Sequence, residues 1–372
     1  MDFELNDEQA MLRDVSRSAL KAHAAPEQVR AAKGTAAGTD LWRTGAELGW
    51  TGLTLPEQYG GSGQGLVELA IVAEELGRSV APGPFVSTAL VGMALTEGRS
   101  QDARDAALAS LADGSAGAAW ALAEHGGVRV PDAVTSTATR DGDTYVLRGR
   151  KTAVQDADDA DWLLVTAAPG GGTPASFLVE RAATGTSTRR QHVIDETRAF
   201  YEVTLDDVRV PDSALIADAA LTARLFQAYA VLTAADALGA AEHLLDMTVE
   251  YAKIRRQFDR PIGSFQAIKH KCADMLMLVQ GARAAVQYAA MAWDAGADDA
   301  ARAASVAKSF TSEAMSEVAG QALQTHGGIG FTWEHDLHLY LRRIKADEAL
   351  GGDAAVHQER LCSLLLAARA AA

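Results

Sequence analysis

Two stretches in the last third of the chain combine arginines or glycines with a helix end, where such residues could bind a ligand. The first reads YAKIRRQFDRPIGSFQAIKH (251–270), in which a helical pattern ends in two arginines and a new helix opens after Pro-Ile-Gly. The second reads QTHGGIGFTWEHD (324–336), in which a helical pattern ends at His326 and two glycines follow. The two glycines let a backbone come close to a ligand. Each stretch alone also fits a basic helix end or a glycine cap, so neither is strong evidence without the other.

A third stretch, RRIKADEALGGD (342–353), raises the question of a catalytic base. It begins as a basic helical turn and ends in a Gly-Gly break, with two carboxylates at Asp347 and Glu348. A general base needs an accessible deprotonated form near the working pH, which a carboxylate provides. We expect both carboxylates to lie on a solvated helix face beside Lys345 and Arg343. The alternative is that Glu348 acts as the catalytic base.

Three regions of different periodicity position these stretches. Residues 1–112 have helical spacing, beginning behind an Asn6-Asp7 start signal. Residues 113–213 alternate in short runs, TYVLRGRKTAV, DWLLVTAA, ASFLVE and FYEVTLDDVRV, and predict an antiparallel β domain. Residues 214–372 contain four long, alanine-rich helical patterns and predict a four-helix bundle. The expected fold class is therefore α+β with three domains.

Composition limits the partners and the location of the protein. Lys and Arg total 34 against 49 Asp and Glu, and the formal charge of -15 repels nucleic acid and anionic membranes. No run approaches the roughly 18 apolar residues of a membrane span, and the acidic, amphipathic N-terminus is not a signal peptide. We expect a cytoplasmic protein in which Cys272 and Cys362 are reduced and buried, without the residue spacing of a metal site.

The stretches 251–270 and 324–336, in this order on this layout, resemble the acyl-CoA dehydrogenase family of flavoproteins. TLPEQYGG in the first region and DDVRVP (206–211) in the second also look like that family, and the resemblance covers nearly the whole chain. It implies an N-terminal helical domain, a middle β domain and a C-terminal bundle, assembled as a dimer of dimers with FAD across a subunit interface. It also implies that a carboxylate removes the α-proton of an acyl-CoA thioester while the β-hydrogen leaves as hydride to flavin, giving a 2-enoyl-CoA.

The resemblance assigns FAD contacts residue by residue. Arg255 matches the arginine that binds the FAD pyrophosphate of the neighbouring subunit, and the Gln-x-x-Gly-Gly turn matches the segment along the same part of FAD. The cofactor-binding residues that it implies are Arg255, Phe258, Gln266, Gln324, Gly327 and Gly328.

The loop expected against the flavin and substrate departs from the family pattern. Family members have a loop similar to Thr-Glu-Pro-Gly-x-Gly-Ser-Asp, and register places it at residues 123–130, Ala-Glu-His-Gly-Gly-Val-Arg-Val. Only Glu124 and Gly126 fit, and the hydroxyls are missing. The next strand departs too, since Ala153 replaces a flavin-facing Trp and Gln155 replaces a Thr. We expect this chain's own isoalloxazine site to be weak or empty; the alternative is a repacked site that uses Gln155 or Arg129.

Both positions at which the family carries its base lack a carboxylate here. Counting from the Gly-Gly motif places one of them at Gly351, and a subgroup's position on the first bundle helix falls at Tyr229. Neither residue readily replaces a carboxylate, because unperturbed Tyr has a pKa of about 10 and Gly has no side chain.

These retentions and losses together favour a subunit that completes another chain's active site. The expected partner is a second acyl-CoA dehydrogenase-like chain in a heterotetramer acting on an acyl-CoA, with an electron-transfer flavoprotein as electron acceptor. The resemblance implies, as an extension, a bulky ring-bearing or steroid-derived CoA ester, on which heteromeric pairs in the family often act. The alternatives are a self-sufficient homotetramer with a relocated base such as Glu348, and a non-catalytic acyl-CoA-binding or structural subunit.

Overall fold

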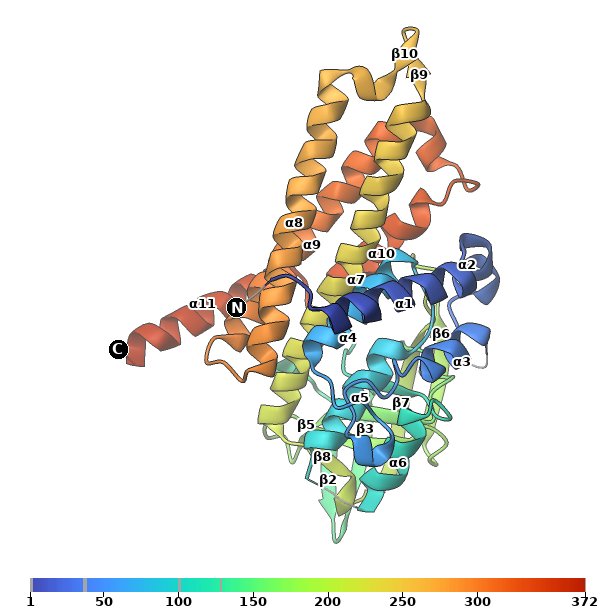
Figure 1. Cartoon of the computed structure of the whole chain (residues 1–372). Coiled ribbons are helices and arrows are strands. Elements are labelled where there is room, and N and C mark those ends of the chain that lie inside the picture. The colour runs from blue at the N-terminus through green and yellow to red at the C-terminus, as the bar shows by residue number, and fades with distance from the viewer. Residues whose placement is uncertain (1–2, 36–38, 100–101, 128, 372) are drawn as a thin grey trace. The chain divides into compact units, whose positions relative to one another are not determined.

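A computed structural model describes residues 3–35, 39–99, 102–127 and 129–371 of the chain (Figure 1). Contacts divide the chain into two compact units. Unit 1 contains Met1–Val29, Ala70–Ala81 and Ala230–Ala372, and unit 2 contains Arg30–Leu69 and Pro82–Tyr229. Within the described residues, no helix combines the length and the apolar character that crossing a bilayer requires.

Unit 2 is built on a sheet of eight strands. In chain order they are β1 (Ala118–Ala121), β2 (Thr137–Asp141), β3 (Thr144–Gln155), β4 (Trp162–Pro169), β5 (Ala175–Glu180), β6 (Thr186–Gln191), β7 (Phe200–Pro211) and β8 (Leu215–Ala217). The strand order is β6-β7-β3-β2-β4-β5-β8, with β1 also paired to β4. Alternate residues of these strands point into one apolar core that includes Leu147, Val165, Phe177 and Val203.

Most strand pairs in this sheet are antiparallel, as the sequence predicted, but two are parallel. β1 pairs in parallel with β4, placing Ala118 opposite Trp162, and β2 pairs in parallel with the end of β4. The expectation of a purely antiparallel domain therefore needs this correction. β1 and β2 are each separated from β4 by intervening chain rather than by a tight turn, so turn residues do not signal these parallel pairs.

Short helices accompany the sheet in unit 2: α3 (Asp40–Glu47), α5 (Phe85–Glu97) and α6 (Asp102–Ala112). The Thr39 hydroxyl caps α3 by accepting a long hydrogen bond (3.4 Å) from the Trp42 N–H. Helix α5 is apolar on all sides and buried along most of its length. The TLPEQYGG segment contains one short 3₁₀ turn, Glu57–Tyr59.

Unit 1 is helical. It contains α1 (Asp7–His23), the C-terminal part of α4 (Leu66–Arg78), most of α7 (Ala219–Ile254), α8 (Gln266–Asp294), α9 (Ala300–His326), α10 (Leu337–Ala349) and α11 (Ala354–Ala371); α2 (Pro26–Ala32) begins in it. Asn6 caps α1 in a capping box with Gln9, which confirms the predicted start. The predicted fourth bundle helix is in fact two, α10 and α11. Gly351 and Gly352 separate them with φ of 66° and 89°, which a helix cannot contain.

Helices α4 and α7 cross with their backbones almost in contact. A Cβ on Gly77 would lie 1.9 Å from the carbonyl oxygen of Asp236, and a Cβ on Gly239 would lie 1.8 Å from that of Glu74. Side chains larger than hydrogen are excluded at both positions, so the two glycines set how closely the helices approach.

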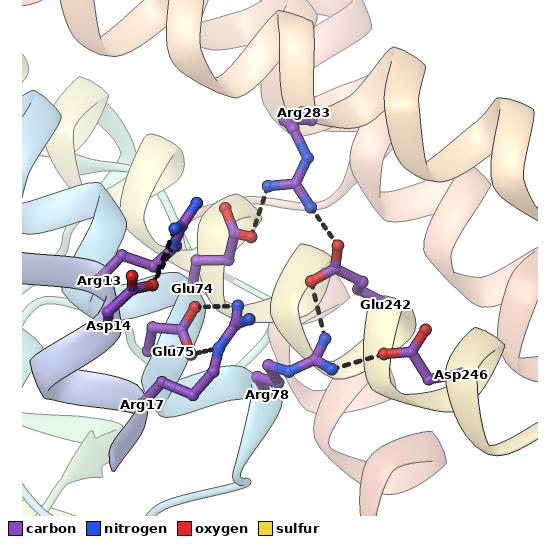
Figure 2. Close-up of polar contacts among 9 residues, drawn as sticks. All are labelled: Arg13, Asp14, Arg17, Glu74, Glu75, Arg78, Glu242, Asp246 and Arg283. Carbon is purple, nitrogen blue, oxygen red and sulfur yellow. Dashed lines mark hydrogen bonds and ion pairs between the residues drawn. The ribbon is translucent and has the colours of Figure 1, made fainter. Parts of the chain in front are cut away.

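A network of ion pairs surrounds this crossing and joins α1, α4, α7 and α8 (Figure 2). Arg283 bridges Glu74 (2.6 Å) and Glu242 (2.7 Å), and Glu242 also pairs with Arg78 (2.7 Å). Arg17 forms two hydrogen bonds with Glu75, a carboxylate that is almost fully buried. Since removal of one partner would leave the other charge buried, the network ties α1 and α4 firmly to the bundle.

The cysteines differ from expectation. Cys272 on α8 is half-buried and Cys362 on α11 is exposed, and both are free thiols. Both lie on helix faces that the rest of the described chain leaves partly uncovered, which is why the general tendency of cysteine to be buried failed here.

Candidate functional site

The predicted phosphate-binding stretch forms a hairpin at the end of α7. Strands β9 (Arg256–Gln257) and β10 (Arg260–Pro261) pair across Phe258 and Asp259, whose φ values are 49° and 60°. Two successive positive φ values give the tight turn that matches strand twist, but a bulky residue there costs on the order of 1–2 kcal/mol. Phe258 occupies this position with its side chain 85% exposed. Residues 255–261 are called the hairpin arm below.

Local contacts hold the base of the hairpin arm. The Arg255 N–H continues the α7 hydrogen-bonding pattern to Tyr251 (2.9 Å), and the Arg255 carbonyl accepts from the Ile262 N–H (2.7 Å). The Arg260 guanidinium lies 4.1 Å from the centre of the Phe265 ring. The Arg255 side chain is different: it is exposed, and no residue in the described part of the chain forms a hydrogen bond or ion pair with it.

The predicted Gly-Gly turn lies beside the end of α7. His326, the last residue of α9, stacks on Tyr251 with ring centres 4.5 Å apart, and its Nδ1–H donates to the Ala322 carbonyl (2.8 Å). Burial lowers the pKa of His326, so the ring is neutral at physiological pH. This stacking joins the turn to the helix that carries the hairpin arm.

The turn itself is open. Gly327 has φ 64° and ψ -141°, a conformation essentially restricted to glycine, and a Cβ on Gly327 or Gly328 would meet no atom within 4 Å. The structure thus places the turn and the hairpin arm at one end of unit 1, with open backbone at one and an unpaired guanidinium at the other. Gln266 at the start of α8 and Gln324 near the end of α9 are both exposed. Open backbone and a guanidinium without a partner in the described chain are features that suit a diphosphate such as that of FAD.

Three exposed apolar residues next to the Gly-Gly turn were not predicted. They are Ile329, Phe331 and Trp333, and the Arg342 guanidinium lies 4.6 Å from the centre of the Trp333 ring. Their alternation with small residues after the glycines was the available sequence signal. Exposed aromatic and arginine side chains of this kind are common at protein interfaces.

The first family base position, Gly351, lies in a buried turn. Its φ is 66°, and a Cβ would lie 3.3 Å from the Thr233 hydroxyl and 3.4 Å from the backbone of Ala230. The Nε2–H of His357 donates to the Gly351 carbonyl (2.8 Å), and the buried Lys308 ammonium donates to the Asp347 carbonyl at the end of α10. Burial lowers the pKa of His357 to about 4, so the ring is a neutral donor. Sequence patterns gave no indication of His357 or Lys308.

The other base candidates, Tyr229 and Glu348, also contact neighbouring side chains. Tyr229 is half-buried, with its ring 5.8 Å from that of Trp120. Glu348 accepts hydrogen bonds from Lys345 and from the Ser316 hydroxyl (2.8 Å). The expected solvated face is wrong for two members: Asp347 is fully buried, and Arg343 is buried with both ends of its guanidinium on Asp236 (2.8 Å each). Their partners come from distant segments, which helical periodicity cannot show.

The strand expected against the flavin is braced from within unit 2. The Ala153 N–H donates to Gln191 Oε1 (2.8 Å), and Gln191 Nε2 donates to the Thr152 hydroxyl (2.8 Å). Gln155 Nε2 donates to the Gly83 carbonyl (3.1 Å) and to Asp156 (3.0 Å). Both amide hydrogens of Gln155 are therefore used inside the unit, and Gln191 is a residue that the sequence did not single out.

In the expected flavin loop, Glu124 turns inward. It accepts hydrogen bonds from Lys151 (2.6 Å), from the Thr135 N–H (2.7 Å) and from the Ser136 N–H (2.9 Å). Burial opposes its ionisation, but Lys151 and these hydrogen bonds outweigh burial and lower the pKa of the carboxyl to about 2. Val128, also part of the predicted loop, lies outside the described residues. Glu124 is thus a structural anchor, and the described part of the loop offers no hydroxyl.

Similarity to known proteins agrees with this layout. Models of the acyl-CoA dehydrogenase N-terminal, middle and C-terminal domains match residues 6–115, 119–208 and 219–365. The chain is 39% identical to acyl-CoA dehydrogenase IpdE2 of Mycobacterium tuberculosis, over 92% of this chain and 93% of that protein.

Two solved structures are also similar over almost their full length. A variant of the steroid acyl-CoA dehydrogenase Tcur3481-Tcur3483 is 33% identical, with a TM-score of 0.90 over 98% of this chain and 99% of that one. The ChsE4-ChsE5 complex of Mycobacterium tuberculosis is 28% identical, with a TM-score of 0.91 and the same coverage. The chain belongs to the acyl-CoA dehydrogenase family, whose members are FAD flavoproteins.

Proposed function

We propose that this chain is the FAD-completing, base-lacking subunit of a heteromeric acyl-CoA dehydrogenase. One contrast carries the proposal. The hairpin arm and the Gly327–Gly328 turn keep open, unpaired groups for a diphosphate, whereas both base positions and the flavin-facing strand have lost theirs. One chain thus holds the donated half of a site without the catalytic half.

In this proposal the protein's own residues bind and orient. Arg255 binds the pyrophosphate of FAD that lies on the partner chain, the open backbone of Gly327 and Gly328 faces the same phosphates, and Phe258 with Gln266 and Gln324 borders the cofactor. When bound, FAD accepts the hydride that leaves the β-carbon of an acyl-CoA thioester. The base that removes the α-proton comes from the partner, because Gly351 and Tyr229 provide none.

The substrate and the electron acceptor are finer parts of the proposal. Two similar structures bear names that describe a steroid enzyme and a complex of two chains, ChsE4 and ChsE5, which supports a bulky, ring-bearing CoA ester and an unlike partner. The proposed acceptor is an electron-transfer flavoprotein, and the complex is expected in the cytoplasm. A homomeric enzyme that uses Glu348 remains the alternative, although its carboxylate is paired with Lys345.

Co-expression with a neighbouring acyl-CoA dehydrogenase gene tests the proposal. We expect a yellow complex with about one FAD for each pair of unlike chains, and an unstable or colourless product from this chain alone. One FAD per chain, or a yellow and active homotetramer, would contradict it. A homotetramer that loses turnover on Glu348→Gln would establish the alternative.

Arg255→Ala tests the arm directly in that complex. Loss of a charged hydrogen-bond donor, worth about 1.5–3 kcal/mol, should weaken FAD retention by roughly ten- to a hundredfold. Lys253→Ala is the matched control, because it removes a nearby charge that is already paired with Glu250 (2.5 Å). Equal FAD retention in both variants would remove Arg255 from the site.

A further inference from the structure

Strand β3 contains a bulge where the flavin-facing strand was expected. The pairing of β3 with β7 shifts register between Lys151 and Val154, so that Thr152 and Ala153 together stand opposite the single residue Glu202. Ala153 has a φ of 50°, a left-handed conformation that a residue with a side chain rarely adopts within a strand. Bulges and backbone outliers of this kind are frequent next to functional sites, because they direct polar groups out of the strand ladder.

Gln191, the last residue of β6, binds the polar groups that the bulge releases. Its Oε1 accepts a hydrogen bond from the Ala153 N–H (2.8 Å), and its Nε2 donates to the Thr152 hydroxyl (2.8 Å). In the strand order β7 lies between β6 and β3, so the Gln191 side chain reaches across the end of β7 to form both bonds. One carboxamide therefore satisfies two groups that the ladder leaves to a side chain.

These two hydrogen bonds define the chemistry that could replace the carboxamide. The Ala153 N–H needs an acceptor, and the Thr152 hydroxyl oxygen accepts from a neighbouring donor. A ligand at this position would therefore present an acceptor beside a donor, which is an amide edge. The pyrimidine end of a flavin has such an edge, a carbonyl oxygen beside a ring N–H. Gln191 thus supplies from within the chain what a flavin would supply from outside.

A second side chain on the same face of β6 holds the adjoining loop. Arg189 donates to Glu202 (3.1 Å), and the same carboxylate forms a hydrogen bond with His125 (2.7 Å) in the expected flavin loop. The loop is also tied to the bulge, because the Thr152 N–H donates to the Ala123 carbonyl (2.9 Å). Strand β6 therefore holds the loop and the bulge together from within unit 2.

We propose that Gln191 closes this chain's own isoalloxazine site, because its carboxamide occupies the Ala153 N–H and the Thr152 hydroxyl in place of the amide edge of a flavin. This inference rests on the proposed function and names the residue that keeps the second flavin site of an unlike pair empty. Loss of the loop hydroxyls weakens such a site, whereas an internal occupant competes with the flavin directly. Gln191 thereby sets the number of flavins that the complex binds.

Riboflavin binding by the FAD-loaded, co-expressed complex tests the inference. Riboflavin carries the isoalloxazine ring without a diphosphate, so its binding is independent of Arg255. Gln191→Ala should bind about one riboflavin per copy of this chain, about tenfold or more tightly than wild type, measured by quenching of riboflavin fluorescence. Gln191→Ser is too short to bridge the two groups and should behave in the same way.

Gln191→Glu is the matched control for the opening of the site. A glutamate of the same length keeps an acceptor for the Ala153 N–H and can accept from the Thr152 hydroxyl. Its riboflavin affinity should therefore stay within about twofold of wild type. Tighter binding by this variant, equal to that of Gln191→Ala, would overturn the role of the two hydrogen bonds.

Hydrogen exchange shows whether the bulge has opened. In Gln191→Ala the Ala153 amide should exchange about tenfold or more faster than in wild type, and riboflavin should restore its protection. The measurement is mass spectrometry of peptides that cover the bulge, on complex recovered with the tagged partner. Unchanged exchange, or faster exchange without riboflavin binding, would overturn the inference.

The two proposals can fail separately. If Arg255→Ala loses FAD while Gln191→Ala binds no riboflavin, the closure by Gln191 is wrong and the cofactor role of Arg255 stands. If this chain alone is a yellow, active homotetramer, the proposed function fails, and its own isoalloxazine site is not closed.

Discussion

The hairpin arm and the Gly351–Gly352 turn both follow a helix end and both contain left-handed backbone, yet their polar groups are used in opposite ways. In the arm, Phe258 is exposed and the Arg255 guanidinium has no partner within the described chain. In the turn, Gly351 is buried and its carbonyl is bound by His357. The arm leaves its charged group available to a ligand outside the chain, whereas the chain itself closes the turn.

The largest expected effect concerns the buried pair of Arg343 and Asp236, since Arg343 lies on α10, the helix that leads into the closed turn. Arg343→Met leaves the Asp236 carboxylate buried without its guanidinium and also removes a hydrogen bond to the Ala81 carbonyl (3.0 Å). The free energy of unfolding should fall by about 3–5 kcal/mol, measured by urea denaturation. Arg342→Met, which removes a neighbouring arginine that is less buried and lies over the Trp333 ring, is the control and should cost less than about 1 kcal/mol. Equal losses in both variants would mean that the pair does not anchor α10.

Acid should open the turn through His357. Burial lowers the pKa of this side chain from 6.5 in the unfolded chain to about 4. As the pH falls, the unfolded state therefore binds a proton at His357 before the folded state does. The stability that the neutral ring contributes is complete above pH 6.5 and is lost as the pH falls toward 4. The difference corresponds to about 3 kcal/mol.

His357→Gln should flatten this part of the stability profile, compared by urea unfolding between pH 4 and 7. The amide can still donate to Gly351 but does not titrate in this range. A variant with the same acid slope as wild type would show that His357 is not the group responsible.

Restoring a carboxylate at the first base position should not restore activity. Gly351→Glu places a side chain in left-handed backbone and against Thr233 and Ala230, at a cost of about 1–3 kcal/mol in stability. We expect no dye-linked oxidation of an acyl-CoA by this chain alone. Gly351→Ala is the control, because it adds the cost of the left-handed backbone with little of the crowding that a glutamate causes. Turnover by Gly351→Glu would show that the turn is not closed.

The smallest expected change in stability concerns the arm. Phe258→Gly relieves a left-handed phenylalanine, and stability should stay level or rise by up to about 1 kcal/mol. FAD retention in the complex should nevertheless fall, because the ring borders the cofactor in the proposed site. Phe258→Asn, which also tolerates this backbone, is the control for the loss of the ring. Unchanged FAD retention in both variants would mean that the left-handed Phe258 shapes only the turn and does not contribute to FAD binding.

The helices and strands were largely predictable because their signals are local. The capping box at Asn6 and the alternating pattern of β3 each act within a few residues. The apolar pattern resumes after Gly351 and Gly352, so it predicted one helix where the structure has two, α10 and α11. The parallel pairing of β1 with β4 was missed because it joins segments more than 40 residues apart.

The site was predictable where its residues cluster in sequence and unpredictable where distant segments bind each other. Arg255, Phe258 and Gln266 occur within one short stretch, and the structure places them around one hairpin and the helix start that follows. The burial of Arg343 depends on Asp236, and the bracing of Ala153 depends on Gln191. Neither partner can be read from local periodicity, so the sequence indicated which groups were lost without showing what replaced them.

The conformation of Gly351 also bears on the evolution of the chain. A single nucleotide change can turn a glycine codon into a glutamate codon, so a catalytic carboxylate at this position is only one mutation away. The left-handed backbone and the close packing of Thr233 and Ala230 nevertheless leave little room for a side chain there, so we expect that this one mutation would not create an active site. Under the proposed function, the gene is useful only together with the gene of its partner, so selection acts on the two chains as one enzyme.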